Sequence, residues 1–372
     1  MWKTVPNIKN AVVELGQRNY NEVIILIHEG GSNMLKLLVT MPVGAVKDSF
    51  LNEETKQLLE QHFDVSYNLM ERNYTAEELA EAAKNCTILV TGWGTPHLGQ
   101  TGLLTKESAL KLVAHTGGSV GDLVDHTAFE NGITVISGNE LYAESTAEGA
   151  LAYMLTALRH IPDDVANMKI PGYWKTEGKN PTAGLFERQI GIVGVGAVAR
   201  NLMRFLKPFR VQLKVYDTYT IDSEFLQEVN AVQTDLEDIF RTCSVISIHA
   251  SLTPHTKGLI GKKYFKLMQE NAIFVNSARG AIVVEDELIE ALQTQNIRAI
   301  LDVYTVEPLP AESPLRNLDN AYLVPHHGGP TIDRRSGIGR AICEDVLRFA
   351  QGQPLRYEIK AEQAARMTTH NS

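Results

Sequence analysis

The sequence is poor in cysteine and in basic residues, and it contains no long apolar run. Its three cysteines, Cys86, Cys243 and Cys343, lie far apart among 372 residues without metal-ligand spacing, so we expect buried or neutral thiols and no metal site. The net charge of -9 argues against nucleic-acid binding, which normally needs a basic face. No apolar stretch approaches the length of a membrane span. These features predict a cytoplasmic protein in a reducing compartment, with neither nucleic acid nor membrane as a partner.

What the chain does contain is a regular alternation of apolar strand patterns with helical patterns, from Lys36 onward. The strand candidates are residues 36–40, 63–67, 87–91, 112–114 and 133–136 in the first half, and 191–195, 213–217, 245–249, 273–276, 299–303 and 322–324 in the second. Such alternation is typical of doubly wound parallel sheets. The length suggests two domains, so we predict an α/β fold of two Rossmann-like domains.

Two helical patterns indicate how these domains are connected. Residues 143–159 are rich in Ala and Leu and are placed to link the halves, whereas the helix expected over 333–351 can return to the first domain. The second domain is therefore expected to be inserted in a flavodoxin-like first domain. The expected boundaries are an N-terminal extension at 1–35, a first domain at 36–142 and 331–372, and a second domain at 143–330. Residues 1–35 fit either an edge strand or a loosely attached extension, and the polar tail over 360–372 is expected to fray.

A glycine turn follows the first strand of the second half. Gly194 suits the tight turn, Gly196 lets backbone amides approach a pyrophosphate, and Ala199 keeps the following helix close to the strand. The positive end of that helix then faces the anion. Because this pattern alone also describes an ordinary strand-to-helix turn, its interpretation depends on the residues that come after it.

An acidic residue follows the glycines at the separation expected of a ribose-binding carboxylate. Asp217 ends the next apolar strand and can accept hydrogen bonds from both ribose hydroxyls while repelling a 2′-phosphate. Thr218 and Tyr219 follow it, so no Arg stands there to bind such a phosphate. The sequence therefore predicts NAD rather than NADP as the cofactor. Residues 143–330 are accordingly expected to be the NAD-binding domain, and residues 36–142 with 331–372 the substrate domain.

Three chemically capable residues each lie just beyond a predicted strand: Arg279, Glu307 and His326. Ligands of open α/β folds bind at the carboxyl ends of the strands. Arg can grip a carboxylate with two hydrogen bonds, and His can give or take a proton near neutral pH, with a carboxylate holding its ring. Each residue alone could be an ordinary surface or loop residue, but the three in this order suit hydride exchange with a 2-keto or 2-hydroxy acid.

The second half closely resembles the D-isomer-specific 2-hydroxyacid dehydrogenases, a family that includes phosphoglycerate dehydrogenase, glyoxylate reductase and D-lactate dehydrogenase. The matching motifs are residues 191–196, 252–256 with 258–260, 276–280, 301–303 with 307–308, and 325–329. The resemblance extends over about residues 36–354 and is strongest from residue 143 onward. It implies an NAD-dependent oxidoreductase that acts on a small 2-hydroxy or 2-keto acid.

The resemblance also implies a role for individual residues. Arg279 resembles the substrate-binding arginine, His326 the acid/base and Glu307 the partner of that histidine. The residues that match cofactor-binding positions are Gly194, Gly196, Ala197, Val198, Asp217, His249, Ala250, Ser251, Thr256, Ser277, Ala278, Arg279, Asp302, His326 and Gly328. Those that match substrate-binding positions are Trp93, Gly94, Gly117, Gly118 and Arg279. A homodimer through the nucleotide domain, using the 143–159 helix and the arm after it, is implied in the same way.

Several departures from the family pattern concern the substrate pocket. The loop at 117–121 lacks the second aligned glycine and the Asp that are usual there, Ser251 replaces a common proline, and His327 and Pro330 replace an apolar and a small polar residue. The substrate therefore stays open. Two alternatives also remain: formate or phosphite oxidation, although the formate enzymes carry Gln at the position of Glu307, and an NAD-sensing, corepressor-like binding protein on the same fold.

Overall fold

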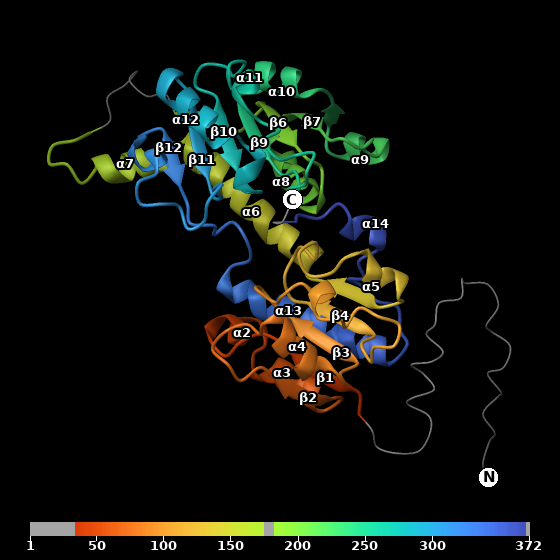
Figure 1. Cartoon of the computed structure of the whole chain (residues 1–372). Helices are drawn as coiled ribbons and strands as arrows, with labels where there is room; N and C mark the ends of the chain where they lie inside the picture. Colours follow the sequence, from red (N-terminus) through yellow and green to blue (C-terminus); the bar gives the residue numbers. More distant parts are fainter. Residues whose placement is uncertain (1–33, 175–181, 370–372) are drawn as a thin grey trace, which may run out of the picture.

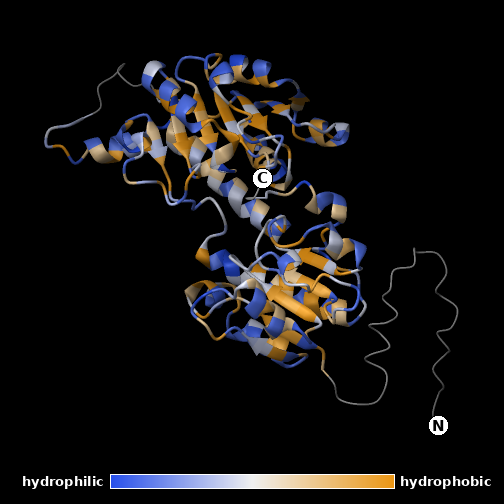
Figure 2. Ribbon diagram, viewed as in Figure 1, coloured by the Kyte–Doolittle hydropathy of each residue, from blue (hydrophilic) through white to orange (hydrophobic). Residues whose placement is uncertain are grey.

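The computed structural model describes residues 34–174 and 182–369 and has two lobes, each built around a parallel sheet (Figure 1). The predicted N-terminal extension lies outside the described residues except for Met34 and Leu35. Apolar residues concentrate on the strands in the middle of each lobe, whereas the helices around them carry many hydrophilic residues (Figure 2). This pattern is expected of parallel sheets covered by helices on both sides.

The first lobe contains a five-stranded parallel sheet with the order β2-β1-β3-β4-β5. Its strands are β1 (Lys36–Val39), β2 (Asp64–Tyr67), β3 (Ile88–Thr91), β4 (Leu112–His115) and β5 (Thr134–Ser137). Strands β3 and β4 are buried along their whole length, because helices cover both faces of the sheet. The expected parallel sheet of the substrate domain is confirmed.

The second lobe contains a seven-stranded parallel sheet with the order β12-β11-β10-β9-β6-β7-β8. Its strands are β6 (Gln189–Val193), β7 (Gln212–Tyr216), β8 (Ala231–Gln233), β9 (Val245–Ile248), β10 (Ile273–Asn276), β11 (Arg298–Leu301) and β12 (Ala321–Leu323). Six of these strands match the predicted ones within a few residues. The short edge strand β8 was not predicted, since two of its three side chains are exposed and give no apolar run.

The helices fill the connections between the strands. The first lobe contains α2 (Ala45–Phe50), α3 (Glu53–Glu60), α4 (Ala76–Ala83), α5 (His126–Glu130), α13 (Ile332–Ala350) and α14 (Ala361–Ala364). The second contains α6 (Asn139–Leu158), α7 (Ile161–Asn167), α8 (Ala197–Leu206), α9 (Ser223–Glu228), α10 (Leu236–Thr242), α11 (Lys262–Phe265) and α12 (Glu285–Thr294). Four single 3₁₀ turns are η1 (Leu98–Gln100), η2 (Lys207–Phe209), η3 (Gly280–Ile282) and η4 (Pro314–Asn317). None of the described helices is both long and apolar enough to cross a bilayer.

Helix α6 lies between β5 of the first sheet and β6 of the second, and it packs mainly against α8. It approaches the end of the second sheet at Gly149, where an added Cβ would lie 3.1 Å from the carbonyl oxygen of Gly328. Helix α13 then returns to the first lobe and packs against α2. We propose the domain division expected from the sequence, with α6 as the connection between the two domains.

The C-terminal segment differs from the expectation of a frayed tail. Met367 is only 8% exposed and packs with the apolar core of the first lobe, and Thr368 is buried as well. The hydroxyl of Ser119 donates to the carbonyl of Thr368 at 2.9 Å, so this part of the tail is held by the loop after β4. The prediction was wrong for residues 361–369 because these contacts join segments about 250 residues apart. Residues 370–372 lie outside the described residues.

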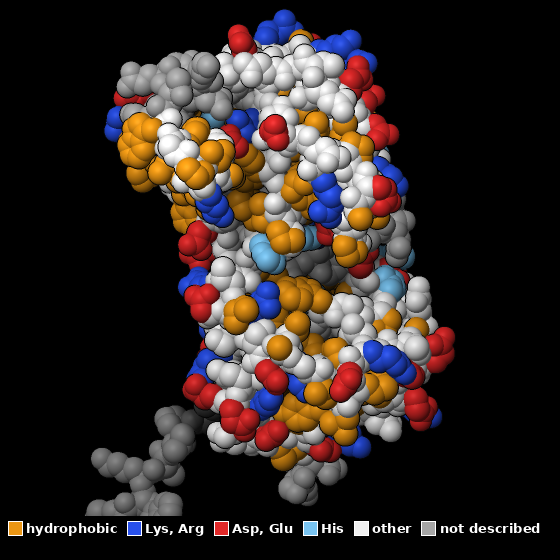
Figure 3. Space-filling view, turned by 90° about the vertical axis from the view of Figure 1, so that its left-hand side faces the viewer, with side chains coloured by type: hydrophobic (Ala, Val, Ile, Leu, Met, Phe, Trp, Pro, Cys, Tyr) orange, Lys and Arg blue, Asp and Glu red, His pale blue; other side chains and the backbone are white. Residues whose placement is uncertain are grey.

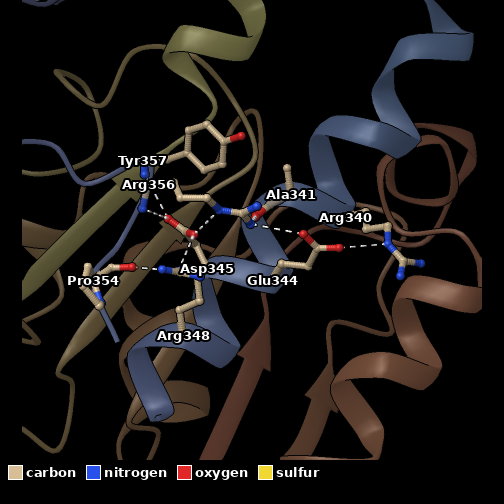
Figure 4. A network of polar contacts seen from close by, with 8 residues as sticks. All are labelled: Arg340, Ala341, Glu344, Asp345, Arg348, Pro354, Arg356 and Tyr357. Carbon is tan, nitrogen blue, oxygen red and sulfur yellow. Dashed lines mark hydrogen bonds and ion pairs between the residues drawn. The ribbon is translucent and has the colours of Figure 1, made fainter. Parts of the chain in front are cut away.

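A polar network directs the chain into this segment (Figure 4). Asp345 on α13 is fully buried and accepts hydrogen bonds from the Arg356 amide at 2.8 Å, the Arg356 Nε at 2.9 Å and the Tyr357 amide at 2.9 Å. Glu344 accepts from Arg356 on one side and from Arg340 on the other. The network fixes the turn after α13, so that Glu358 forms an antiparallel bridge with Ile136 of β5.

Candidate active site

The glycine turn after β6 has the geometry expected of a dinucleotide site. Gly194 has a φ of 89°, and a Cβ there would lie 2.4 Å from the Cα of Ala250 in the loop after β9, so only glycine fits. At Gly196, the N-cap of α8, an added Cβ would meet nothing within 4 Å. Gly194 therefore lets the turn pack against the loop after β9. Gly196 leaves open space in front of the first amides of α8, which belong to Ala197 and Val198.

Asp217 follows β7 and lies beside the glycine turn. Its Oδ2 accepts from the Val195 amide at 2.7 Å, and its Oδ1 accepts from the Tyr219 amide at 3.1 Å. The carboxylate is thereby fixed at the edge of the turn, at the position from which the sequence predicts contact with ribose hydroxyls.

These loops line a cavity of about 680 Å³, a volume within the range of roughly 300–1,000 Å³ for cofactor sites. The predicted cofactor residues that line it are Gly194, Gly196, Asp217, His249, Ala250, Ser251 and Thr256. Desolvation lowers the pKa of His249 to about 4, and its Nε2 lies 2.8 Å from the Ser247 hydroxyl, so the ring is neutral near pH 7. Asp217 and the glycines of the turn, Gly194 and Gly196, thus line the same cavity.

Arg279 follows β10 and is held by close backbone packing. An added Cβ at Gly280 would lie 1.9 Å from the carbonyl carbon of Tyr304, so the loops after β10 and β11 are in direct contact. Burial lowers the pKa of Arg279, while the carboxylates of Glu307 and Asp122 act in the opposite direction. Asp122 belongs to the first lobe, which places the guanidinium near the boundary between the lobes.

Glu307 and His326 form the predicted pair. The His326 Nδ1 lies 2.6 Å from Glu307 Oε2, and the other carboxylate oxygen accepts from the Tyr304 amide at 2.9 Å. Because a carboxylate only accepts, Nδ1 carries the proton in this contact and Nε2 is the ring nitrogen left for proton transfer. His326 also has a left-handed backbone with a φ of 52°, a conformation that is uncommon for residues other than glycine.

Asp302 lies behind the loop that carries His326 and is 1% exposed. Its Oδ1 accepts from the His327 amide at 2.7 Å and from the Tyr153 phenol at 3.0 Å, and its Oδ2 accepts from the Gly328 amide at 2.8 Å. The resemblance places Asp302 at the nicotinamide carboxamide. In the structure both carboxylate oxygens are engaged by the protein, so the evident role of Asp302 is to shape the 326–328 loop.

Two buried polar atoms without a hydrogen-bond partner among the described residues lie on this side of the site. They are the Ser277 Oγ and the Arg279 Nε, both directly after β10. Buried polar groups normally have a partner. These atoms, the space beside Gly196 and the cavity around Asp217 together fit a bound dinucleotide.

The four predicted substrate residues of the first lobe lie on the loops after β3 and β4. Trp93 is 43% exposed and packs edge-on against Phe50, and Gly94 has a φ of 77°. A Cβ at Gly117 would lie 2.3 Å from the Nε2 of the buried His115, and one at Gly118 would lie 3.6 Å from the Tyr142 ring. Gly117 therefore allows the loop to pack closely over His115, whereas a Cβ at Gly118 would make only an ordinary van der Waals contact.

Apart from Ala197 and Val198, which begin α8 and do not line the cavity, the structure gathers the predicted residues into three groups rather than one. One group lines the cavity, the second (Ser277, Ala278, Arg279, Asp302, Glu307, His326 and Gly328) follows β10, β11 and β12, and the third (Trp93, Gly94, Gly117 and Gly118) belongs to the first lobe. Figure 3 shows a hollow between the lobes with histidine side chains beside it. The described parts contain no cluster of three or more His, Cys, Asp or Glu side chains placed to hold a metal ion.

Sequence reasoning missed several residues near the site. Tyr153 supports Asp302, His115 lies beneath Gly117, and the Arg335 guanidinium lies 5.1 Å above the Trp93 ring. Arg366 of the tail lines the cavity. His115 had a signal, since it directly precedes the glycine loop, whereas Arg366 had none, because its position depends on the tail folding back.

The fold and the glycine turn define an α/β protein with a dinucleotide-binding lobe. Residues 151–328 match the family described as D-isomer specific 2-hydroxyacid dehydrogenase, NAD binding domain. A glyoxylate reductase/hydroxypyruvate reductase from Homo sapiens is 33% identical over 249 residues, covering 65% of this chain and 75% of that protein. The chain belongs to the D-isomer-specific 2-hydroxyacid dehydrogenase family, and its second lobe is the NAD-binding domain.

Two further comparisons bear on length and fold. A D-3-phosphoglycerate dehydrogenase from Methanocaldococcus jannaschii is 31% identical over 322 residues, which cover 86% of this chain but 58% of that protein. The chain thus spans little more than half of this relative. The D-lactate dehydrogenase structure from Escherichia coli superposes with a TM-score of 0.66 at 24% identity, covering 88% of this chain and 100% of the other, and shows the same fold.

Proposed function

We propose that this protein interconverts a D-2-hydroxy acid and the corresponding 2-keto acid with NAD as the cofactor. The observation that carries the proposal is the Glu307–His326 hydrogen bond of 2.6 Å, which lies on the same sheet edge as Arg279 and follows the strands of an NAD-binding domain. A proton donor and an anion-binding cation at the carboxyl ends of neighbouring strands are what this reaction needs.

Each side chain has a distinct part in this proposal. Bound NAD supplies the hydride acceptor or donor. Arg279 binds the substrate carboxylate and polarises its carbonyl, and its burial strengthens both interactions because water is excluded. His326 exchanges the proton of the substrate oxygen through Nε2, while Glu307 holds the ring through Nδ1. Asp302 and Tyr153 keep the 326–328 loop in place.

The substrate pocket is proposed to form between this edge and the loops of the first lobe. Gly117 and Gly118 lie where backbone amides of the family hold the substrate carboxylate, and Trp93 with Gly94 shapes the neighbouring wall. Desolvation lowers the pKa of the buried His115 to about 4, so this ring adds no charge beneath the loop near pH 7. The pocket therefore relies on Arg279 for its positive charge on the side of the second lobe.

The test is NADH oxidation with a panel of 2-keto acids, which includes glyoxylate, hydroxypyruvate, phosphohydroxypyruvate, pyruvate and phenylpyruvate. The names of the relatives make the first three the strongest candidates. We expect Arg279→Ala and His326→Ala to lower turnover by about 10²- to 10⁴-fold with little change in NADH affinity. Normal turnover in either variant would refute the assigned roles, and NADH binding without turnover of any acid would favour a sensor.

We also propose that the protein forms a homodimer through the 143–159 helix and the arm after it, which begins with α7. Large apolar side chains are exposed there, with Trp174 at 70%, and the others are Ile161, Val165, Met168 and Ile170. Exposed apolar patches of this kind mark interaction surfaces. Light scattering should give twice the mass of the 41.2 kDa chain, and Val165→Asp should shift it toward the monomer. A monomer at micromolar concentration would remove this proposal.

The cysteines bear on the proposed reducing, cytoplasmic setting. All three are free and buried, and burial raises the pKa of Cys243 to about 11 and that of Cys343 to about 12. Thiols with raised pKa values are poorly reactive. We expect thiol titration of the native protein to find all three reduced and slow to react.

A further inference from the structure

The C-terminal segment forms part of the wall of the cavity beside the glycine turn. Its residues Ala365, Arg366, Met367 and Thr369 line the same space as Gly194, Gly196 and Asp217. The segment comes from the first lobe, through the bridge between Glu358 and Ile136, yet it reaches the cofactor side of the second lobe. Figure 1 shows α14 at the boundary of the two lobes.

The segment is held by hydrogen bonds to both lobes. On the first lobe, the Val120 amide lies 3.4 Å from the Met367 Sδ, and Ser119 bonds the carbonyl of Thr368. On the second lobe, the Leu252 amide donates to the Thr368 hydroxyl at 3.2 Å, and the Thr369 amide donates to the Leu252 carbonyl at 3.3 Å. A segment held in this way presents its side chains to the cavity in a defined position.

Arg366 is the residue of this segment best suited to contact a nucleotide. Its guanidinium lies over the Tyr219 ring, 4.2 Å from the centroid, and the residue remains exposed. Tyr219 donates its amide to Asp217, so the stacked pair stands directly beside the predicted ribose position. Among the residues that line the cavity, the Lys and Arg side chains are Arg200 and Arg366, against the single carboxylate of Asp217.

We propose that residues 365–369 belong to the dinucleotide site, with Arg366 covering the adenosine half of NAD on its Tyr219 side. A planar guanidinium stacks on aromatic faces and attracts the negative diphosphate, so it favours an adenine nucleotide in two ways. The proposal assigns to the first lobe a direct contact with the cofactor. It rests on the NAD site proposed above.

The test compares Arg366→Ala with Glu362→Ala, an exposed position on the same segment that does not line the cavity. NADH affinity is measured by fluorescence titration, and ADP-ribose, AMP and nicotinamide mononucleotide are measured by calorimetry. Arg366→Ala should weaken NADH, ADP-ribose and AMP by about 3- to 30-fold, the range of a partly desolvated cation–π contact. Nicotinamide mononucleotide should bind as in the wild type, and Glu362→Ala should change none of the four. Thermal melting checks that both variants are folded.

The possible failures are distinguishable. If the wild-type protein does not bind NADH, the NAD site itself is refuted. If the wild type binds NADH and Arg366→Ala matches Glu362→Ala, the contribution of Arg366 is refuted. NADPH affinity is measured last. If Arg366→Ala weakened the binding of NADPH alone, Arg366 would bind the 2′-phosphate, and the assignment to adenosine would be overturned. Tyr219→Ala should reproduce the loss, and Tyr219→Phe should not.

Discussion

The phenol of Tyr153 on α6 donates a hydrogen bond of 3.0 Å to Asp302, the buried carboxylate that also receives the amides of His327 and Gly328. One side chain of the connecting helix is thereby coupled to the loop that carries His326. The position of the proposed proton donor consequently depends on contacts from two directions, Glu307 at its ring and Asp302 behind its backbone.

Removing the Tyr153 hydroxyl should weaken both the fold and the site. In Tyr153→Phe, Asp302 keeps its two backbone donors but loses the third, so we expect the free energy of unfolding to fall by about 1–3 kcal/mol, the range for hydrogen bonds to charged groups. Turnover should also fall, because the 326–328 loop is less constrained. Urea denaturation and steady-state kinetics measure the two effects.

The matched control for that variant is Tyr67→Phe. Tyr67 also donates to a carboxylate, Glu60, at 2.9 Å, but this contact is exposed and lies on the edge strand β2. We expect it to change stability by less than about 1 kcal/mol and turnover not at all. If Tyr153→Phe changed stability and turnover as little as this control, the Tyr153–Asp302 hydrogen bond would not contribute to holding the 326–328 loop.

Gly280 should tolerate no side chain. An added Cβ would lie 1.9 Å from the Tyr304 carbonyl carbon, so Gly280→Ala must separate the loops that carry Arg279 and Glu307. We expect a loss of stability of about 1–3 kcal/mol or more, together with a large loss of turnover. Gly337→Ala is the control, because this exposed glycine within α13 has nothing near its Cβ direction and should gain up to about 1 kcal/mol. Equal thermal midpoints for the two variants would contradict the proposed packing.

Burial of His115 should make stability depend on pH in the acidic range. The folded pKa is about 4, whereas unfolding returns the imidazole to water and a pKa of about 6.5. Between these values the unfolded chain binds a proton that the folded chain does not, so the free energy of unfolding falls as pH falls, by up to about 1.4 kcal/mol per pH unit. Above about pH 6.5 this contribution is constant.

The pH effect is measured as a slope rather than as an absolute stability. His115→Gln should give a shallower decline of unfolding free energy between pH 6.5 and pH 4.5, even though it also costs the contact with Thr91 at 2.9 Å. His62→Gln, at an exposed position just after α3, should leave the slope unchanged. A wild-type slope in the His115 variant would show that this histidine is not the source.

Charge and position can be separated at Glu307. Glu307→Gln keeps one oxygen, which can accept from His326 Nδ1 in place of Oε2, but it puts an NH2 group toward the Tyr304 amide and removes the negative charge beside the ring. We expect turnover to fall roughly 10-fold, less than for His326→Ala, with NADH affinity unchanged. Glu307→Ala should lower turnover further, because it also removes the hydrogen bond that holds the His326 ring. Turnover at the wild-type level in both variants would leave Glu307 a structural residue only.

The alternation of strands and helices predicted the two sheets, because buried parallel strands are continuous apolar runs whose order along the chain is easy to read. The glycine turn and Asp217 were predictable for the same reason, since they directly follow such strands. Strand β8 was not predicted because it is short and exposed. Helix α7 was not predicted because it has no buried face and therefore no apolar periodicity. The roles assigned to Arg279, Glu307 and His326 remain predictions until the variants are measured.

Long-range contacts set the limit of prediction from the sequence. Met367 is the one large apolar side chain among residues 360–369, and its burial depends on a loop some 250 residues earlier. Likewise, nothing in the local pattern around Tyr153 indicates that it meets Asp302. Such pairs are set by how the lobes pack, which neither periodicity nor spacing describes.

Two backbone amides at the tail, those of Leu252 and Thr369, can report on the separation of the two lobes. The chain crosses between the lobes twice, at α6 and before α13, and the tail adds a non-covalent third link through Thr368. The amides of Leu252 and Thr369 are hydrogen-bonded across this link. Hydrogen exchange at these two amides therefore measures the free energy of opening the cleft, as distinct from that of unfolding either lobe, and should slow when NAD binds.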